Sequence, residues 1–126
     1  MKNLKKLQAQ AKTAISNGDF SSAIQVLNGL LAQDEKNTAY LMMRGEALLR
    51  AEVYEPALSD YAKVVEAEPH NVDALNNFAV ALIRCNRQVE AEKIFEYVLE
   101  LQPNNFDAHT STFVTFTNHF DNQKKV

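Results

Sequence analysis

Two stretches of the chain repeat each other at an interval of 34 residues. Residues 66–75 read EAEPHNVDAL and residues 100–109 read ELQPNNFDAH, with Glu, Pro, Asn, Asp and Ala at the same places. A Pro followed by Asn, just before an apolar pattern, is typical of the boundary between two helices. Its recurrence at Pro69 and Pro103 indicates that the chain consists of copies of one structural unit.

Residues 4–105 can be written as three such units without a gap, at 4–37, 38–71 and 72–105. Each unit has a small residue at its eighth and twentieth positions and a large one at its twenty-fourth. These are Ala11, Gly45 and Ala79, then Ala23, Ala57 and Ala91, then Leu27, Tyr61 and Phe95. Apolar residues recur at helical spacing in two blocks, so each unit is predicted to be two antiparallel helices. The small residues let the two backbones approach, and the large one fills the space toward the neighbouring unit.

The repeat also predicts where the helices begin and end. We expect helices at 3–16, 20–33, 38–50, 54–67, 72–85, 88–101 and about 106–120. Pro69 and Pro103 stop two of them, because proline lacks an amide hydrogen and clashes with the preceding turn. The caps of the following helices are either the last residues of the units, Asn37, Asn71 and Asn105, or the adjacent Thr38, Asp73 and Asp107.

The 34-residue spacing, the small pair, the large twenty-fourth residue and the Pro at the thirty-second position resemble the tetratricopeptide repeat (TPR). The third unit, VDALNNFAVALIRCNRQVEAEKIFEYVLELQPNN, matches best. Gln10 and Arg44 stand where the family usually has Leu, and Glu35 replaces the Pro of the first unit. The resemblance implies an all-α, right-handed solenoid of seven helices. It would form a single domain over 1–126, with three repeats, a capping helix at about 106–120 and a short tail at 121–126.

Composition narrows the classes of function. The formal net charge is −3, and the acidic excess lies within residues 37–105, so the basic stripe of a nucleic-acid-binding domain is not expected. No apolar run reaches the roughly 20 residues needed to cross a bilayer. The amino-terminal lysines would also suit a membrane-surface helix, but Leu4, Leu7, Ala11 and Ile15 form the stripe of a core-facing helix. With a single cysteine and no secretory signal pattern, a cytoplasmic protein is expected.

The sequence contains no recognisable catalytic or metal-binding pattern. The three histidines, His70, His109 and His119, have no metal-ligand spacing, and no Gly-rich phosphate loop is present. Cys85 has no evident activating partner and is expected to be an inert thiol. We therefore expect no enzyme, no cofactor and no metal.

The resemblance implies that the first helices of the units line a concave groove that accepts a peptide or helix of a partner protein. Carried over by position, the groove candidates are Lys12, Met42, Met43, Glu46, Arg50, Asn76, Asn77 and Arg84. Amides can bond a peptide backbone, methionines adapt to apolar groups, and the cations suit acidic groups. Some family members grip a peptide's carboxyl terminus with Lys and Asn at positions held here by Gln8, Lys12 and Met43. That clamp is absent, so such a terminus is not the expected ligand.

The last predicted helix, FDAHTSTFVTFTNHF, begins like the first helix of a fourth unit. Its Phe113, Phe116 and Phe120 fall on one helical face. This face either caps the third unit or, if it is exposed, docks a partner or a second copy in a homodimer. The sequence therefore leaves two functions open, which are peptide binding in the groove and self-association through these phenylalanines.

Overall fold

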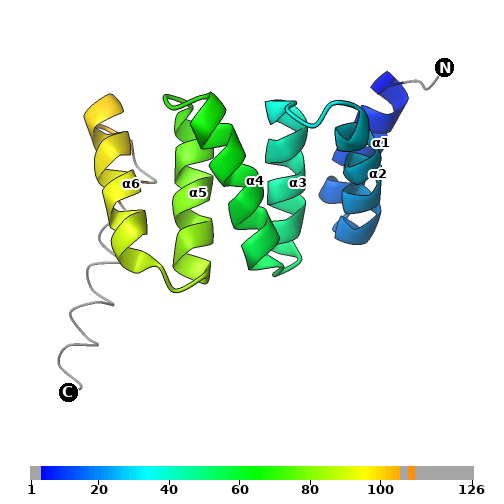
Figure 1. Cartoon of the computed structure of the whole chain (residues 1–126). Coiled ribbons are helices and arrows are strands. Elements are labelled where there is room, and N and C mark those ends of the chain that lie inside the picture. The colour runs from blue at the N-terminus through cyan, green and yellow to red at the C-terminus, as the bar shows by residue number, and fades with distance from the viewer. Residues whose placement is uncertain (1–3, 106–107, 110–126) are drawn as a thin grey trace. The chain divides into compact units, whose positions relative to one another are not determined.

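The structure, a computed structural model, describes residues 4–105 and 108–109. These residues form six α-helices and no strand (Figure 1). They divide into two compact units, Met1–Pro69 and His70–Val126, and the division falls in the turn between the second and third repeats. The expected all-α fold of paired helices is confirmed.

The first unit contains the first two repeats. Its helices are α1 (Leu4–Ser16), α2 (Phe20–Gln33), α3 (Thr38–Arg50) and α4 (Tyr54–Ala67). Helix α1 packs on α2, and α3 packs on α4; α2 also packs on α3 and so joins the two repeats. Within each pair the chain reverses through a short turn, so the two helices run antiparallel (Figure 1).

The second unit contains the third repeat, with α5 (Val72–Arg84) packed on α6 (Gln88–Leu101). The predicted ends of the helices are reproduced closely, except that α5 ends one residue early and Cys85 occupies its cap. The predicted helix at about 106–120, with its three phenylalanines, lies outside the described residues apart from Ala108 and His109. Ala108 is buried.

The last residue of each repeat accepts a hydrogen bond from an amide three residues further on, and in Asn37 and Asn71 this bond caps the next helix. The side-chain oxygen of Asn37 accepts a hydrogen bond from the Tyr40 amide at 3.0 Å. Asn71 and Asn105 accept equivalent bonds at 3.1 Å and 2.8 Å, from the amides three residues further on. Of the two sets of caps left open by the sequence, the asparagines are the ones used. They satisfy amides that would otherwise lack a partner in the first turn.

The turn between the two helices of each repeat requires a left-handed residue at the fifteenth position. Gly18, Glu52 and Asn86 have φ angles of 78°, 64° and 63° there. Glycine adopts this conformation freely and asparagine tolerates it, whereas a glutamate is strained by its Cβ atom. The second repeat therefore has the least suitable residue of the three at this turn.

The small residues predicted at the eighth and twentieth positions are all buried, which confirms the close approach of paired helices. The tightest contact is at Gly45, where an added Cβ would lie 2.8 Å from Cζ of Tyr61. Tyr61 is only 1% exposed. The sequence placed this large residue toward the neighbouring repeat, and the structure adds that its ring closes its own helix pair against Gly45.

Candidate functional site

In the first unit, the candidate residues come from α1 and α3. Met42, Glu46 and Arg50 recur every four residues, so they form one stripe along α3. Arg50 and Lys12 are exposed, while Met42 and Glu46 are half-buried. This face thus combines cations that reach solvent with an apolar and an acidic group held close to the helix surface.

Helices α1 and α3 contact each other directly along this side of the unit. The Gln8 amide donates a hydrogen bond of 2.7 Å to the hydroxyl of Tyr40, which is buried. Gln8 is therefore engaged within the chain. The bond fixes the spacing of the two helices, and so it helps to set the separation between Lys12 and the stripe on α3.

Met43 has a packing role that its sequence position did not reveal. Its half-buried side chain packs against a cluster of Ile15, Ala23 and Ala47, together with other apolar residues of α1 and α2. The contact joins the first repeat to the second. Of the two adjacent methionines, Met42 is therefore the better placed to contact a partner, and Met43 chiefly stabilises the unit.

The charged groups of the stripe act on the buried Tyr61 hydroxyl. Burial raises the pKa of Tyr61 far above its ordinary value, and the negative charges of Glu46 and Asp60 raise that pKa further. Arg50 opposes the shift. The phenol of Tyr61 therefore stays protonated at physiological pH, so no phenolate is present to act as a general base.

The sequence analysis noted Arg44 only as a departure from the family pattern, and its partner was missed. Its guanidinium makes two parallel bonds to the Asp60 carboxylate, at 2.8 Å from Nε and 2.7 Å from Nη2. The third nitrogen donates to the Asn28 side chain at 3.0 Å. Asp60 is 2% exposed and is the one charged side chain fully buried among the residues described. The hydrogen bonds that Arg44 donates to Asp60 raise the pKa of the Arg44 guanidinium.

This ion pair holds three helices together, since Asn28 lies on α2, Arg44 on α3 and Asp60 on α4. The same positions carry Gln10 and Val26 in the first repeat and Phe78 and Ile94 in the third. The opposite charges at the seventh and twenty-third positions could have indicated a pair. Because Arg44 and Asp60 are 16 positions apart in the chain and lie on different helices, only the packed structure shows that they meet.

In the second unit, the candidates Asn76, Asn77 and Arg84 lie on α5. Asn76 and Asn77 are half-buried, and Arg84 is exposed in the last turn. The Asn76 amide donates a long hydrogen bond of 3.5 Å to the Asn105 side chain. Its own oxygen is buried and has no hydrogen-bond partner among the residues that the structure describes. Leaving such an acceptor unsatisfied costs about 1–3 kcal/mol.

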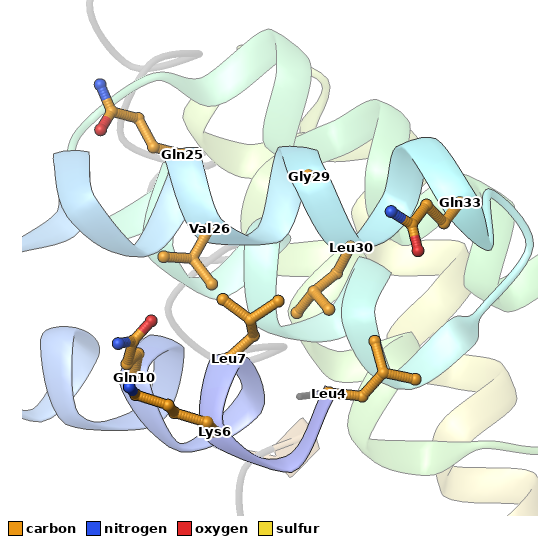
Figure 2. A pocket seen from close by; sticks show the side chains of 9 residues that line it. All are labelled: Leu4, Lys6, Leu7, Gln10, Gln25, Val26, Gly29, Leu30 and Gln33. Atoms are coloured by element: carbon orange, nitrogen blue, oxygen red, sulfur yellow. The ribbon is translucent and has the colours of Figure 1, made fainter. Parts of the chain in front are cut away.

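A hollow in the first unit was not anticipated from the sequence. It has a volume of about 510 Å³ and lies between α1 and α2 (Figure 2). Its lining residues are Leu4, Lys6, Leu7, Gln10, Gln25, Val26, Gly29, Leu30 and Gln33. We call it the α1/α2 pocket. None of the predicted groove residues lines it.

The described part of the chain holds no group of three or more His, Cys, Asp or Glu side chains arranged to bind a metal. Over the same ranges, no helix is both long enough and apolar enough to cross a membrane. Cys85, in the cap of α5, is a half-buried thiol.

Paired helices in a gapless 34-residue repeat, with small residues at the crossing and asparagine caps between repeats, define a tetratricopeptide-repeat protein. Residues 12–126 match the family described as "Psidin, N-terminal TPR repeats region", and the chain belongs to this family.

Known relatives match this chain over short regions of much longer proteins. Human peptidyl-prolyl cis-trans isomerase FKBP4 is 39% identical over 74 residues, which are 59% of this chain and 16% of that protein. Protein STIP1 homolog of Dictyostelium discoideum is 30% identical over 96 residues, which are 76% of this chain and 17% of that protein. The chain thus spans only a small part of the length of these curated relatives.

Solved structures confirm the fold. The structure "First TPR of Spaghetti (RPAP3) bound to HSP90 peptide SRMEEVD" superposes with a TM-score of 0.83 at 25% identity and covers 89% of both chains. The first TPR domain of human RPAP3 gives a TM-score of 0.84 at 23% identity, covering 95% of this chain and 94% of that one. The matched structures are TPR domains.

Proposed function

We propose that this chain is a non-catalytic protein-interaction module that holds a peptide segment or helix of a partner protein on the faces of its A helices, α1, α3 and α5. The observation that carries the proposal is its likeness, over 89% of its length, to a TPR domain whose structure contains a bound peptide. Neither a nucleic acid nor a membrane is the proposed partner. A cytoplasmic setting suits a chain whose single cysteine cannot form an internal disulfide.

The chemistry of the first unit favours a peptide with an acidic residue beside an apolar one. Lys12 and Arg50 present exposed cations, and Met42, on the same stripe of α3 as Arg50, offers an adaptable apolar surface. A guanidinium can bond a carboxylate through two hydrogen bonds, which gives direction as well as attraction. In the second unit, Asn77 and Arg84 offer an amide and a further cation to the same kind of ligand.

The absent carboxylate clamp makes the choice of peptide testable. The RPAP3 domain is bound to a peptide that ends in EEVD, whereas this chain has Gln8, Lys12 and Met43 at the clamp positions. In addition, Gln8 is bonded to Tyr40 and Met43 is packed into the unit. We therefore propose that this chain binds the peptide SRMEEVD weakly and prefers a segment recognised through its side chains rather than its terminal carboxylate.

A peptide-display selection on the full chain tests the proposal. Peptides enriched from a random library are synthesised, and their affinities are measured by fluorescence anisotropy. We expect Arg50→Glu to weaken the best peptide by about tenfold or more, which corresponds to about 1.4 kcal/mol. Lys63→Glu reverses one charge on α4 instead and is the matched control, with no expected effect. Peptides that tolerate Arg50→Glu but are lost with Lys63→Glu would refute a site on the A helices.

The second candidate function is self-association through Phe113, Phe116 and Phe120. These residues lie outside the described ranges, so the structure does not test it directly. The observation that favours it is the open apolar α1/α2 pocket, which offers a place where such phenylalanines can bind.

A further inference from the structure

The α1/α2 pocket has an apolar floor and a mostly neutral rim. Leu7, Val26 and Leu30 meet between the two helices, as Figure 2 shows. Leu4 lies at one end and is 48% exposed, which is unusual for a leucine in a repeat that is otherwise well packed. Gly29, three glutamines and Lys6 complete the lining. A surface of this kind gains most from an apolar occupant with uncharged flanks.

The internal repeat shows what shape of occupant fits. Leu41, Asp60 and Val64 of the second repeat correspond to Leu7, Val26 and Leu30, and all three are buried. Helix α2 packs on this side of the second repeat, where Asn28 bonds Arg44. In the first repeat, no helix among the described residues covers the equivalent surface. Because the two repeats share one backbone design, we expect a helix to be the occupant that fits this surface.

Gly29 is a second and independent indication of a close approach. It lies inside α2, where glycine costs about 1 kcal/mol relative to alanine. Its backbone is not left-handed, and an added Cβ would meet nothing within 4 Å. The second and third repeats carry Lys63 and Tyr97 at this position. Neither its backbone conformation nor the packing of the described residues requires a glycine at position 29. A bulky group of another molecule, packed directly on α2, would require one.

We propose that the α1/α2 pocket binds the Phe-bearing segment 106–120 of a second copy of this chain. That segment is predicted to be an amphipathic helix with three phenylalanines on one face. Residues 110–120 contain no Asp, Glu, Lys or Arg. A helix that is uncharged over residues 110–120 and carries an aromatic stripe matches both the apolar floor and the glutamine rim of the pocket. This proposal rests on the second candidate function, self-association through the phenylalanines, and names its binding site; it does not depend on peptide binding on the A helices.

The sizes of the facing residues support this choice of occupant. The eighth position of each described repeat is small, and Gly45 there receives the large Tyr61 of its paired helix. The same position in segment 106–120 is the large Phe113, so a helix that packs against it needs a small residue in return. Gly29 supplies that residue. In the Gly45 and Tyr61 pair the first helix of the repeat carries the small residue. In the proposed contact it carries the large residue, Phe113, and α2 carries the small one, so a large side chain would again face a small one.

The contact joins unlike surfaces, since the carboxyl-terminal segment of one copy meets the amino-terminal repeat of another. Such heterologous contacts extend into chains or close into rings. The contact buries apolar groups and few charges, so its strength should change little with added salt. Peptide binding through Lys12 and Arg50 should, in contrast, weaken as salt is added.

Sedimentation equilibrium of the full chain, up to the millimolar range, tests the proposal. Wild-type protein should self-associate, and Gly29→Lys should weaken association by about tenfold or more. This change introduces the residue that the second repeat already carries, so folding should be unaffected. Phe116→Asp should have the same effect on association. Ala32→Lys, on the same helix but outside the pocket, is the control and should associate like wild type. Circular dichroism verifies that each variant keeps its helices.

A mixing experiment separates this contact from its alternatives. The Gly29→Lys variant keeps an intact segment, and the Phe116→Asp variant keeps an intact pocket. Mixed together, they should form a one-to-one complex and nothing larger. A monomeric wild type, unchanged association in Gly29→Lys, or failure of the two variants to combine would each overturn the proposal. The last result would indicate a contact between two Phe faces instead. None of these results would count for or against the separate proposal that the A helices bind peptides.

Discussion

The close contact between Gly45 and Tyr61 makes the effect of one methyl group predictable. In Gly45→Ala, the new Cβ would lie 2.8 Å from Cζ and 3.0–3.1 Å from both Cε atoms of the ring. No side chain normally tolerates such a distance, and the ring has little freedom to move because it is 1% exposed. Overpacking of this kind costs about 2 kcal/mol. Alanine regains about 1 kcal/mol of helix propensity. We expect a net loss of about 1 kcal/mol in the free energy of unfolding.

The sign should reverse when the ring is removed. The first repeat has Ala11 with Leu27 at the equivalent positions, and both are fully buried. In a Tyr61→Leu background, the methyl group no longer clashes and the helix propensity remains, so Gly45→Ala should stabilise by about 1 kcal/mol. The coupling energy between the two changes is then about 2 kcal/mol, which is typical of residues in direct contact.

Urea unfolding of the four proteins, followed by circular dichroism, measures this coupling. A change of 1 kcal/mol shifts the midpoint by about 0.5 M when the slope is unchanged. Gly45→Ala should lower the midpoint of the wild type and raise that of Tyr61→Leu. An equal rise in both backgrounds would show that the ring does not restrict the eighth position, and the packing argument would be wrong.

Three further changes test other parts of the structure. Glu52→Gly should raise the unfolding temperature by roughly 4 °C, because it removes a strained left-handed glutamate worth about 1 kcal/mol; Glu52→Ala should not, since alanine keeps the Cβ atom. Asn76→Met should raise the free energy of unfolding by about 1 kcal/mol, because it removes an unsatisfied buried acceptor. It should also weaken the binding of selected peptides if this amide contacts the partner. An unchanged unfolding temperature would contradict the stability prediction. The hydrogen bond from Arg87 lowers the pKa of Glu90, so any stability from this pair is present above the ordinary glutamate pKa and is lost as pH falls through the lowered value. Carbon NMR titration should show Glu90 titrating below exposed glutamates in the wild type but not in Arg87→Gln.

The helices could be predicted almost to the residue because the repeat fixes their register. One gapless period places every turn, small residue and asparagine cap in three copies, so an error in one copy would contradict the other two. The caps show where this reasoning stops. Asn71 and Asp73 were equally acceptable from their chemistry, and only the geometry of the turn selects Asn71.

The candidate site could be predicted as a face but not as a set of contacts. Helical periodicity places Met42 and Met43 next to each other, yet one borders the predicted binding face and the other packs between two repeats. The pair of Arg44 and Asp60 was missed for a related reason. Two charges on different helices can be recognised as partners only when the helices are packed, because their separation in the chain carries no such information.

Three residues that the repeat pattern does not explain fall into two kinds, according to whether their cost is met within the described structure. Arg44 departs from the pattern, but Asp60 and Asn28 satisfy all of its bonding directions within the chain, so its role is structural. Gly29 and the Asn76 oxygen cost stability, and nothing in the described structure compensates for them. Selection for folding alone would replace both, since alanine or methionine would be more stable there. Their cost is explained if partners supply the missing contacts, at the A-helix face for Asn76 and in the α1/α2 pocket for Gly29.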